Sequence, residues 1–232
     1  LENAFPYMDN YNYHKGMNGI IQELKCLLKT KNIGIDSDQA LLLDFQAAIE
    51  TKPEKAIKLE KDALAQIETI TADNARLVSN LHANLGGLYR MNGHPDLARE
   101  HMEKSISLLD QFNLLHINDS IPQIANYAMF LTEQQEPERG ISELQKLSGI
   151  IKEYHSDDCL DYAKVQETLG TIYLMTANLP QAKTHFKRAF KIYEKIWADE
   201  PEMIKAKYQE IQELYPQIGF SIGKTLSGLL TK

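Results

Sequence analysis

Cysteine, tryptophan and long apolar runs are scarce in this chain of 232 residues. Its two cysteines, Cys26 and Cys159, form no C-x-x-C pair, so the sequence signals neither a disulfide framework nor a zinc site and favours a reducing, cytoplasmic location. No apolar run reaches the roughly 18 residues that span a bilayer, and the N-terminus lacks the basic and apolar regions of a signal peptide. There is no initiator methionine, which predicts that Leu1 begins a fragment.

An excess of positive charge is also missing. Lysine and arginine number 25 against 32 aspartate and glutamate residues, which gives a formal net charge of −7. Such a chain has no electrostatic footprint for nucleic acid, and an anionic membrane surface would repel it on average. We therefore expect neither as a direct partner. The 43% of hydrophobic and 25% of charged residues are ordinary for a folded protein of one large domain or a repeat array.

The stretch GFSIGKT at 219–225 matches a phosphate-binding loop only in part. That motif places four residues between its glycines and follows a strand. Here three residues separate Gly219 from Gly223, Ile218 stands where the first glycine should be, and a helical pattern ending in Pro216 precedes the stretch. The sequence therefore predicts a packing role for this segment and no nucleotide or other cofactor.

A repeat of 42 residues organises the chain. Proline-led segments PEKA, PDLA and PERG start at Pro53, Pro95 and Pro137, and one further step gives LPQA, with Ala182 in register. A second set of small residues keeps the same period: Gly86, Ala128 and Gly170. Two sets of positions that share one period indicate a repeated structural unit.

Each unit is predicted to be a helical hairpin. The small residues lie in apolar patterns of helical period, such as Leu81, Leu85, Leu88 and Tyr89. Proline is favoured in the first turn of a helix, so it marks the start of each second helix. Gly86 and Ala98 would mark the point where the two helices cross. Bulkier residues would fill the space beside the crossings: Met102, Leu144 and Phe186.

The stretch TLGTIYLMTANLPQAKTHFKRAF at 168–190 resembles the tetratricopeptide repeat, with L-G-x-x-Y followed by A-x-x-x-F-x-x-A. The matching positions are Leu169, Gly170, Tyr173, Ala182, Phe186 and Ala189. Repeats of this family usually run about 34 residues, so the longer period resembles the kinesin-light-chain-like subgroup. The segment WADEPEMIKAKYQE at 197–210 looks like a linker of that subgroup. HEAT repeats have similar periods, but the L-G-x-x-Y and proline positions favour the tetratricopeptide interpretation.

The resemblance implies an all-α fold, a right-handed α-solenoid of stacked antiparallel helical hairpins with atypical capping helices at both ends. Four units would start near 37, 79, 121 and 163 within an array over 37–215. Hairpins are expected near 38–69, 76–112, 119–153 and 160–198. Residues 1–36 would be an N-terminal helical cap or the remnant of a preceding unit, and 216–232 a C-terminal capping helix.

The resemblance also implies a binding module that holds an extended segment of a protein partner in a groove lined by the first helix of each unit. A carboxamide such as Asn84 or Asn126 can hold both the N–H and the C=O of a peptide backbone. Each asparagine could instead hydrogen-bond to a neighbouring helix. The predicted groove residues are Asn80, Asn84, Gly87, Arg90, Met91, Asn126, Met129, Glu133, Lys164, Glu167, Thr168, Thr171 and Met175.

Other functions find less support in the sequence. The family's clamp for a C-terminal carboxylate is rejected, because only Asn126 and Lys164 match its positions. None of the seven histidines pairs at metal-ligand spacing, so no metal site and no catalytic residue is predicted. The chain is therefore predicted not to be an enzyme. A sensor or autoinhibitory segment of a larger bacterial regulator, such as a signal-transducing ATPase or a peptide-pheromone receptor, stays open as the alternative, as does self-association.

Overall fold

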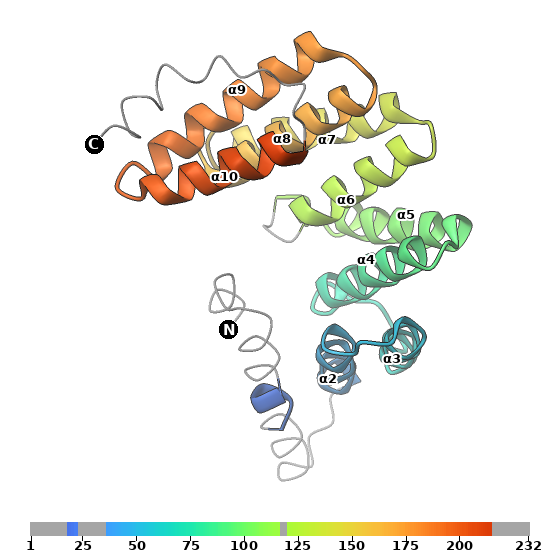
Figure 1. Cartoon of the computed structure of the whole chain (residues 1–232). Helices are drawn as coiled ribbons and strands as arrows, with labels where there is room; N and C mark the ends of the chain where they lie inside the picture. The colour runs from blue at the N-terminus through green and yellow to red at the C-terminus, as the bar shows by residue number, and fades with distance from the viewer. Residues whose placement is uncertain (1–17, 23–35, 117–119, 215–232) are drawn as a thin grey trace. The chain divides into compact units, whose positions relative to one another are not determined.

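A computed structural model describes residues 18–22, 36–116 and 120–214, and within these ranges the chain is helical and contains no strand (Figure 1). Residues 18–22 form a short helical segment. The chain divides into two compact units, Leu1–Leu114 and Leu115–Lys232. The predicted terminal caps fall largely outside the described residues, and GFSIGKT falls wholly outside them.

The first unit contains two helical hairpins. Helix α2 (Asp36–Ala48) pairs with α3 (Pro53–Ala65), and α4 (Ala75–Met91) pairs with α5 (Pro95–Gln111). Helix α3 packs against α4 and α2 also touches α4, so the two hairpins are stacked.

The second unit contains two further hairpins and one additional helix. The hairpins are α6 (Ser120–Glu133) with α7 (Pro137–Tyr154), and α8 (Leu160–Met175) with α9 (Leu179–Ile196). Helix α8 packs on both α6 and α7, and α10 (Pro201–Leu214) packs on α9. The predicted all-α fold of stacked hairpins is confirmed. The segment 197–210, predicted as a linker, instead contains most of helix α10.

Proline starts the second helix of every hairpin. Pro53, Pro95, Pro137 and Pro180 occupy the first or second position of α3, α5, α7 and α9. The missing N–H costs nothing there, because the first turn has no carbonyl partner for it, and the fixed φ of proline suits a helix. The repeated proline therefore fixes where each hairpin turns back.

Close crossings hold the last three hairpins together, and each pairs one glycine with one alanine at matching positions of the repeat. A Cβ atom added to Gly86 would lie 2.5 Å from Cγ of Met102 and 3.3 Å from the carbonyl oxygen of Ala98. In α7 the order is reversed, and a Cβ on Gly140 would lie 2.6 Å from the carbonyl oxygen of Ala128. The predicted crossing at Gly86 and Ala98 is confirmed.

The third of these crossings is filled by aromatic side chains. A Cβ on Gly170 would come within 2.9 Å of the Phe186 ring. Phe186 and Phe190 are fully buried, and Tyr193 stacks on Trp197 with 4.7 Å between ring centroids. The core of each hairpin therefore lies along the line where its two helices cross.

The turns between first and second helices of the last three hairpins share one backbone conformation. Gly93, Gln135 and Ala177, spaced by 42 residues, all have positive φ, at 73°, 65° and 58°. In the last turn, the N–H of Asn178 donates to the carbonyl of Tyr173 at 2.7 Å, and the N–H of Ala177 donates to that of Leu174 at 2.9 Å. This pair of bonds is the Schellman motif, in which glycine is preferred at the left-handed position.

Gly140→Ala should destabilise the protein by about 1–3 kcal/mol, because its new methyl group would meet a backbone oxygen that cannot rotate away. Gly149→Ala, on the same helix, is the matched control. Its Cβ would meet nothing within 4 Å, and alanine favours a helix over glycine by about 1 kcal/mol, so this variant should be more stable than wild type. Urea unfolding of both variants checks the prediction, and equal stabilities would contradict it.

Ala177→Gly should stabilise the protein by about 1 kcal/mol, since a non-glycine residue in the left-handed region carries a steric cost of that order. Ala206→Gly, an exposed position inside α10, makes the same chemical change in right-handed helix and should instead destabilise. Thermal unfolding of both variants distinguishes the backbone effect from a general effect of glycine. A lower melting temperature for Ala177→Gly would refute the left-handed strain.

Candidate functional site

The predicted groove residues lie on the first helices of three hairpins. Those on α4 are Asn80, Asn84, Gly87, Arg90 and Met91. Those on α6 are Asn126, Met129 and Glu133. Those on α8 are Lys164, Glu167, Thr168, Thr171 and Met175. None is fully buried, so each first helix carries a stripe of solvent-facing or half-buried positions, which we call the first-helix stripe.

Methionine ends two of these stripes at one position of the repeat. Met91 on α4 is 75% exposed and Met175 on α8 is 47% exposed, while the equivalent residue of α6, Glu133, is also exposed. Methionine is flexible and polarisable, which suits adaptable apolar contact with a partner. Exposed methionines at equivalent positions therefore give both units a similar apolar contact point.

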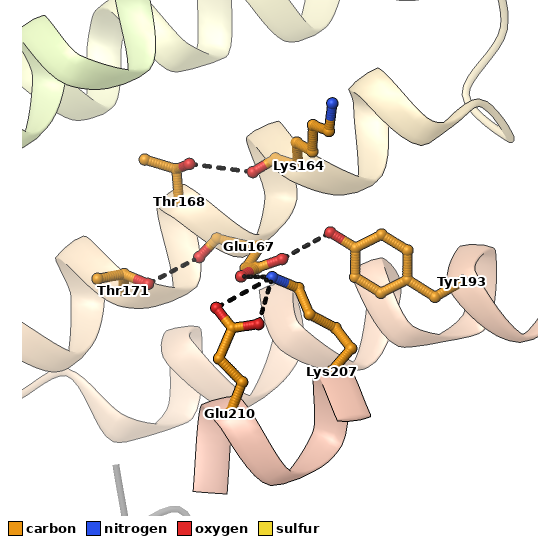
Figure 2. A network of polar contacts seen from close by, with 7 residues as sticks. All are labelled: Lys164, Glu167, Thr168, Thr171, Tyr193, Lys207 and Glu210. Atoms are coloured by element: carbon orange, nitrogen blue, oxygen red, sulfur yellow. Dashed lines mark hydrogen bonds and ion pairs between the residues drawn. The ribbon is translucent and has the colours of Figure 1, made fainter. Parts of the chain in front are cut away.

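The stripes of α6 and α8 lie on neighbouring helices of the second unit. Asn126 is exposed, and no described residue hydrogen-bonds its amide. The Thr168 and Thr171 hydroxyls donate to the backbone carbonyls of Lys164 and Glu167, at 3.0 and 3.1 Å (Figure 2). These hydroxyls therefore offer a ligand only an acceptor oxygen and a methyl group.

Glu167 is tied to the following helices. Its Oε2 accepts from the Tyr193 hydroxyl of α9 at 2.6 Å, and its Oε1 lies 2.8 Å from Nζ of Lys207 on α10 (Figure 2). Lys207 also reaches Glu210 at 3.1 Å. Burial alone would lower the pKa of Lys207, but the two carboxylates outweigh it and raise that pKa, while burial and the Glu167 charge raise the pKa of Tyr193. Glu167 thus fastens α10 to the last hairpin.

The side-chain amide of Asn84 is hydrogen-bonded within the first unit. Its Nδ2 donates to Oδ1 of Asp44 on α2 at 2.9 Å and to Oε1 of Glu60 on α3 at 3.1 Å. Both amide hydrogens are therefore used, and only the carbonyl oxygen of Asn84 is left for a ligand. This is the alternative in which an asparagine bonds to neighbouring helices.

The Asp44–Glu60 pair replaces the apolar crossing seen in the other hairpins. Asp44 stands one repeat before Gly86, and Glu60 stands one repeat before Met102. Glu60 is 2% exposed, and no described donor reaches its Oε2. The sequence analysis missed this pair, although two carboxylates at the positions of a glycine and a methionine were a readable signal.

The Asp44 and Glu60 carboxyl groups accept from the same Asn84 amide, so the two acids lie close together where water is largely excluded. Burial, reinforced by the charge of Asp44, raises the pKa of Glu60 far above its usual range, against the smaller effect of the Asn84 bond. Burial also raises the pKa of Asp44, while its bonds to Glu60 and Asn84 lower it. Glu60 is therefore protonated near neutral pH, as expected when two acids meet out of water.

Histidine pairs across a hairpin at one place. Nδ1 of His82 on α4 lies 2.9 Å from Nδ1 of His101 on α5, so one ring donates and the other accepts. Two repeats later, Nδ1 of His185 lies 2.9 Å from Oε1 of Gln166. Burial lowers the pKa of His82 to about 4 and also lowers that of His101. These contacts are neutral polar links between first and second helices.

The part of the chain that the structure describes contains no group of three or more histidine, cysteine or acidic residues able to hold a metal ion. Within those described ranges, no helix combines the length and apolarity that a membrane crossing requires.

Repeated hairpins with proline-led second helices and small residues at their crossings define a helical repeat protein of the tetratricopeptide class. The family model described as tetratricopeptide repeat matches residues 120–195, the part of the chain that forms α6 to α9. The predicted resemblance is confirmed. Tetratricopeptide repeats generally bind protein partners and are typically not enzymes.

Solved structures share the fold at low sequence identity. The crystal structure of BtubC (BKLC) from P. vanneervenii is 18% identical, with a TM-score of 0.67 over 89% of this chain and 83% of that one. A putative kinesin light chain from Podosopora anserina with nearly identical TPR-like repeats is 13% identical, with a TM-score of 0.62 over 80% and 92%. MamA is 18% identical, with a TM-score of 0.52 over 82% and 97%. No protein of curated function matches the sequence.

Glu60→Gln should flatten the dependence of stability on pH. The pKa of Glu60 is higher in the folded state than the value near 4.5 expected for the unfolded chain. The protonated Glu60 side chain therefore contributes fully to stability below pH 4.5, and this contribution is lost as pH rises through the pKa of the folded state. The wild-type free energy of unfolding should therefore fall between about pH 5 and 8, by at most about 1.4 kcal/mol per pH unit from this group. A glutamine amide can donate to Asp44 and accept from Asn84 without a titrating proton.

Urea unfolding at several pH values measures this slope. Glu54→Gln, an exposed position on the same helix, is the control and should leave the slope as in wild type. The difference in unfolding free energy between Glu60→Gln and wild type should grow in favour of the variant as pH rises. A difference that stays constant would show that Glu60 is ionised in the folded protein.

Proposed function

We propose that the chain is a protein-interaction module that binds an extended segment of a partner along the first-helix stripes of α6 and α8. The observation that carries this proposal is the pair of neighbouring stripes on α6 and α8, where an exposed asparagine amide without a described partner stands one repeat from a short polar side chain. The proposal assigns no catalytic step, no metal and no cofactor to the chain.

Asn126 and Thr168 supply the backbone contacts in this proposal. Asn126 offers an N–H donor and a C=O acceptor together, which match the backbone of an extended peptide of any sequence. Thr168, at the same position of the next repeat, offers an acceptor oxygen because its own proton is bonded to the helix. Side-chain selectivity comes from Lys164 and Glu133 through charge, and from Met175 through apolar contact.

Asn84 contributes less to the proposed site than Asn126. Its amide hydrogens hold Asp44 and Glu60, so a ligand can reach only its carbonyl oxygen. Removing the Asn84 side chain would also leave a buried acid pair with one partner fewer, and that change would disturb the fold. A test of binding therefore uses residues of the second unit.

Asn126→Ala combined with Lys164→Ala should weaken peptide binding at least roughly tenfold, which corresponds to about 1.4 kcal/mol. Peptides are first selected from a random display library against the wild-type chain, and their affinities are measured by calorimetry. Gln145→Ala with Lys146→Ala removes the same two chemical groups from exposed positions on α7, a second helix, and should leave the affinity unchanged. Circular dichroism verifies that both double variants keep their helices.

Two results would contradict the proposal. Selected peptides that bind both double variants as tightly as wild type would place the binding surface on another part of the chain. A greater loss in the α7 variant would move that surface to the second helices.

A further inference from the structure

Helix α9 carries an unusual concentration of positive charge for this acidic chain. Its residues include five lysines or arginines and a single carboxylate, Glu194. The chain as a whole has a formal net charge of −7. Three of the lysines, Lys183, Lys187 and Lys191, follow one another at steps of four residues and are all exposed. Residues at this spacing share one face of a helix, so they form a row that we call the α9 lysine row.

The fold does not require this charge. The residues that occupy the same positions of the repeat on α5 are Arg99, Glu103 and Ser107. On α7 they are Ile141, Gln145 and Gly149. The helices of all three hairpins form the same crossings with these different surfaces, so the positive row is specific to α9.

The positive charges of the row are available for a partner. No described residue forms an ion pair with Lys183, Lys187 or Lys191. The nearby Asp158 pairs with Lys195 at the end of the helix, and Lys191 has only a smaller charge interaction with that carboxylate. The row therefore keeps its positive charge facing solvent.

A surface pocket, which we call the hollow, lies beside the α9 lysine row. Its volume is about 400 Å³, and Lys187, Arg188 and Lys191 line it on the α9 side. Tyr162 of α8 also lines it, with Nζ of Lys152 5.2 Å from the centre of the Tyr162 ring. Asp157 and Asp158 are acidic residues of its wall, and Asp158 is paired with Lys195. The surface thus combines several cations with one aromatic ring.

We propose that the α9 lysine row and its hollow bind an acidic segment of a partner protein, in extended conformation, with carboxylates at alternate positions. Four residues of helix advance by about 6 Å. Alternate residues of an extended chain lie on one side and are spaced by about 6.6 Å. Successive lysines of the row can therefore meet successive carboxylates at positions i, i+2 and i+4 of the segment.

A protein segment suits this surface better than nucleic acid does. The row is only about two helical turns long, the hollow has Asp157 and Asp158 in its wall, and the rest of the chain is acidic, so a long polyanion would meet repulsion beyond the row. Lysines act as separate point charges, and such charges along a row fit carboxylates that are spaced in the same way.

The test measures fluorescence anisotropy of labelled peptides with the full chain at about 0.1 M ionic strength, where charges interact over about 10 Å. One peptide alternates glutamate with serine, and its isomer has the same glutamates in one contiguous block. The alternating peptide should bind wild type more tightly than the isomer. Lys187→Gln with Lys191→Gln should weaken its binding about tenfold, as expected for the loss of two ion pairs.

Two control variants make the result specific. Lys55→Gln with Lys58→Gln, at exposed positions of α3, changes the net charge equally and should alter the affinity by less than about twofold. Asn126→Ala lies in the proposed first-helix site and should leave this peptide's affinity unchanged. The α9 proposal and the first-helix proposal can therefore fail separately.

Four outcomes would overturn the α9 proposal. Wild type could fail to bind the alternating peptide, or could bind the contiguous isomer equally well. If the α9 and α3 double variants lost the same amount of affinity for the alternating peptide, the effect would be one of net charge alone. A single-stranded DNA of equal charge that binds more tightly than the peptide, and loses affinity in the α9 variant, would show a nucleic-acid surface instead.

Discussion

The close approach of two helices within each hairpin is the constraint on which the rest of this structure depends. At Gly86 and at Gly140 there is no room for even one methyl group, because the facing helix already occupies the space of a Cβ. Dense packing of this kind leaves few alternative arrangements of a hairpin. Once the crossing and the proline-led turn are fixed, the outward positions of each helix are fixed as well. They are then free to vary in chemistry without disturbing the hairpin.

The first hairpin shows what happens when this constraint is relaxed. It has Asp44 and Glu60 where the others have a small residue and a bulky apolar one, and both acids accept hydrogen bonds from Asn84 of the next hairpin. A carboxyl pair is weaker than packed apolar surface unless it is fully hydrogen-bonded. The stability of this hairpin is therefore linked to pH and to the presence of α4, whereas the apolar crossings depend on neither.

The hairpins, their proline-led second helices and the glycine crossings could be predicted because each recurs at a fixed distance along the chain. The polar contacts between helices were not predicted residue by residue, because the residue types at those positions change from one repeat to the next. Asn84 donates to Asp44 40 residues away, and the next repeats have a small residue in place of that acid. The contact of His82 with His101 recurs two repeats later, but between Gln166 and His185. Helix α10 was missed because its segment was interpreted as a linker from the resemblance, although α10 begins at residue 201, 41 residues after α8 begins at residue 160, and so nearly keeps the period. For the candidate site, the periodicity identified the outward positions. Only the structure shows that the side chains of Glu167 and Asn84 are hydrogen-bonded to neighbouring helices.

The surfaces proposed for binding lie at outward positions, where the residue type varies from one repeat to the next. Equivalent outward positions carry Asn84, Asn126 and Thr168 on first helices, and Glu103, Gln145 and Lys187 on second helices. Because the crossings do not depend on these side chains, neighbouring hairpins can present different chemistry on the same backbone. A first-helix stripe with amides suits a peptide backbone of any sequence, whereas a row of lysines selects for carboxylates. A partner that touched both surfaces would gain affinity from the first and specificity from the second, since charge discriminates among ligands more than it strengthens binding.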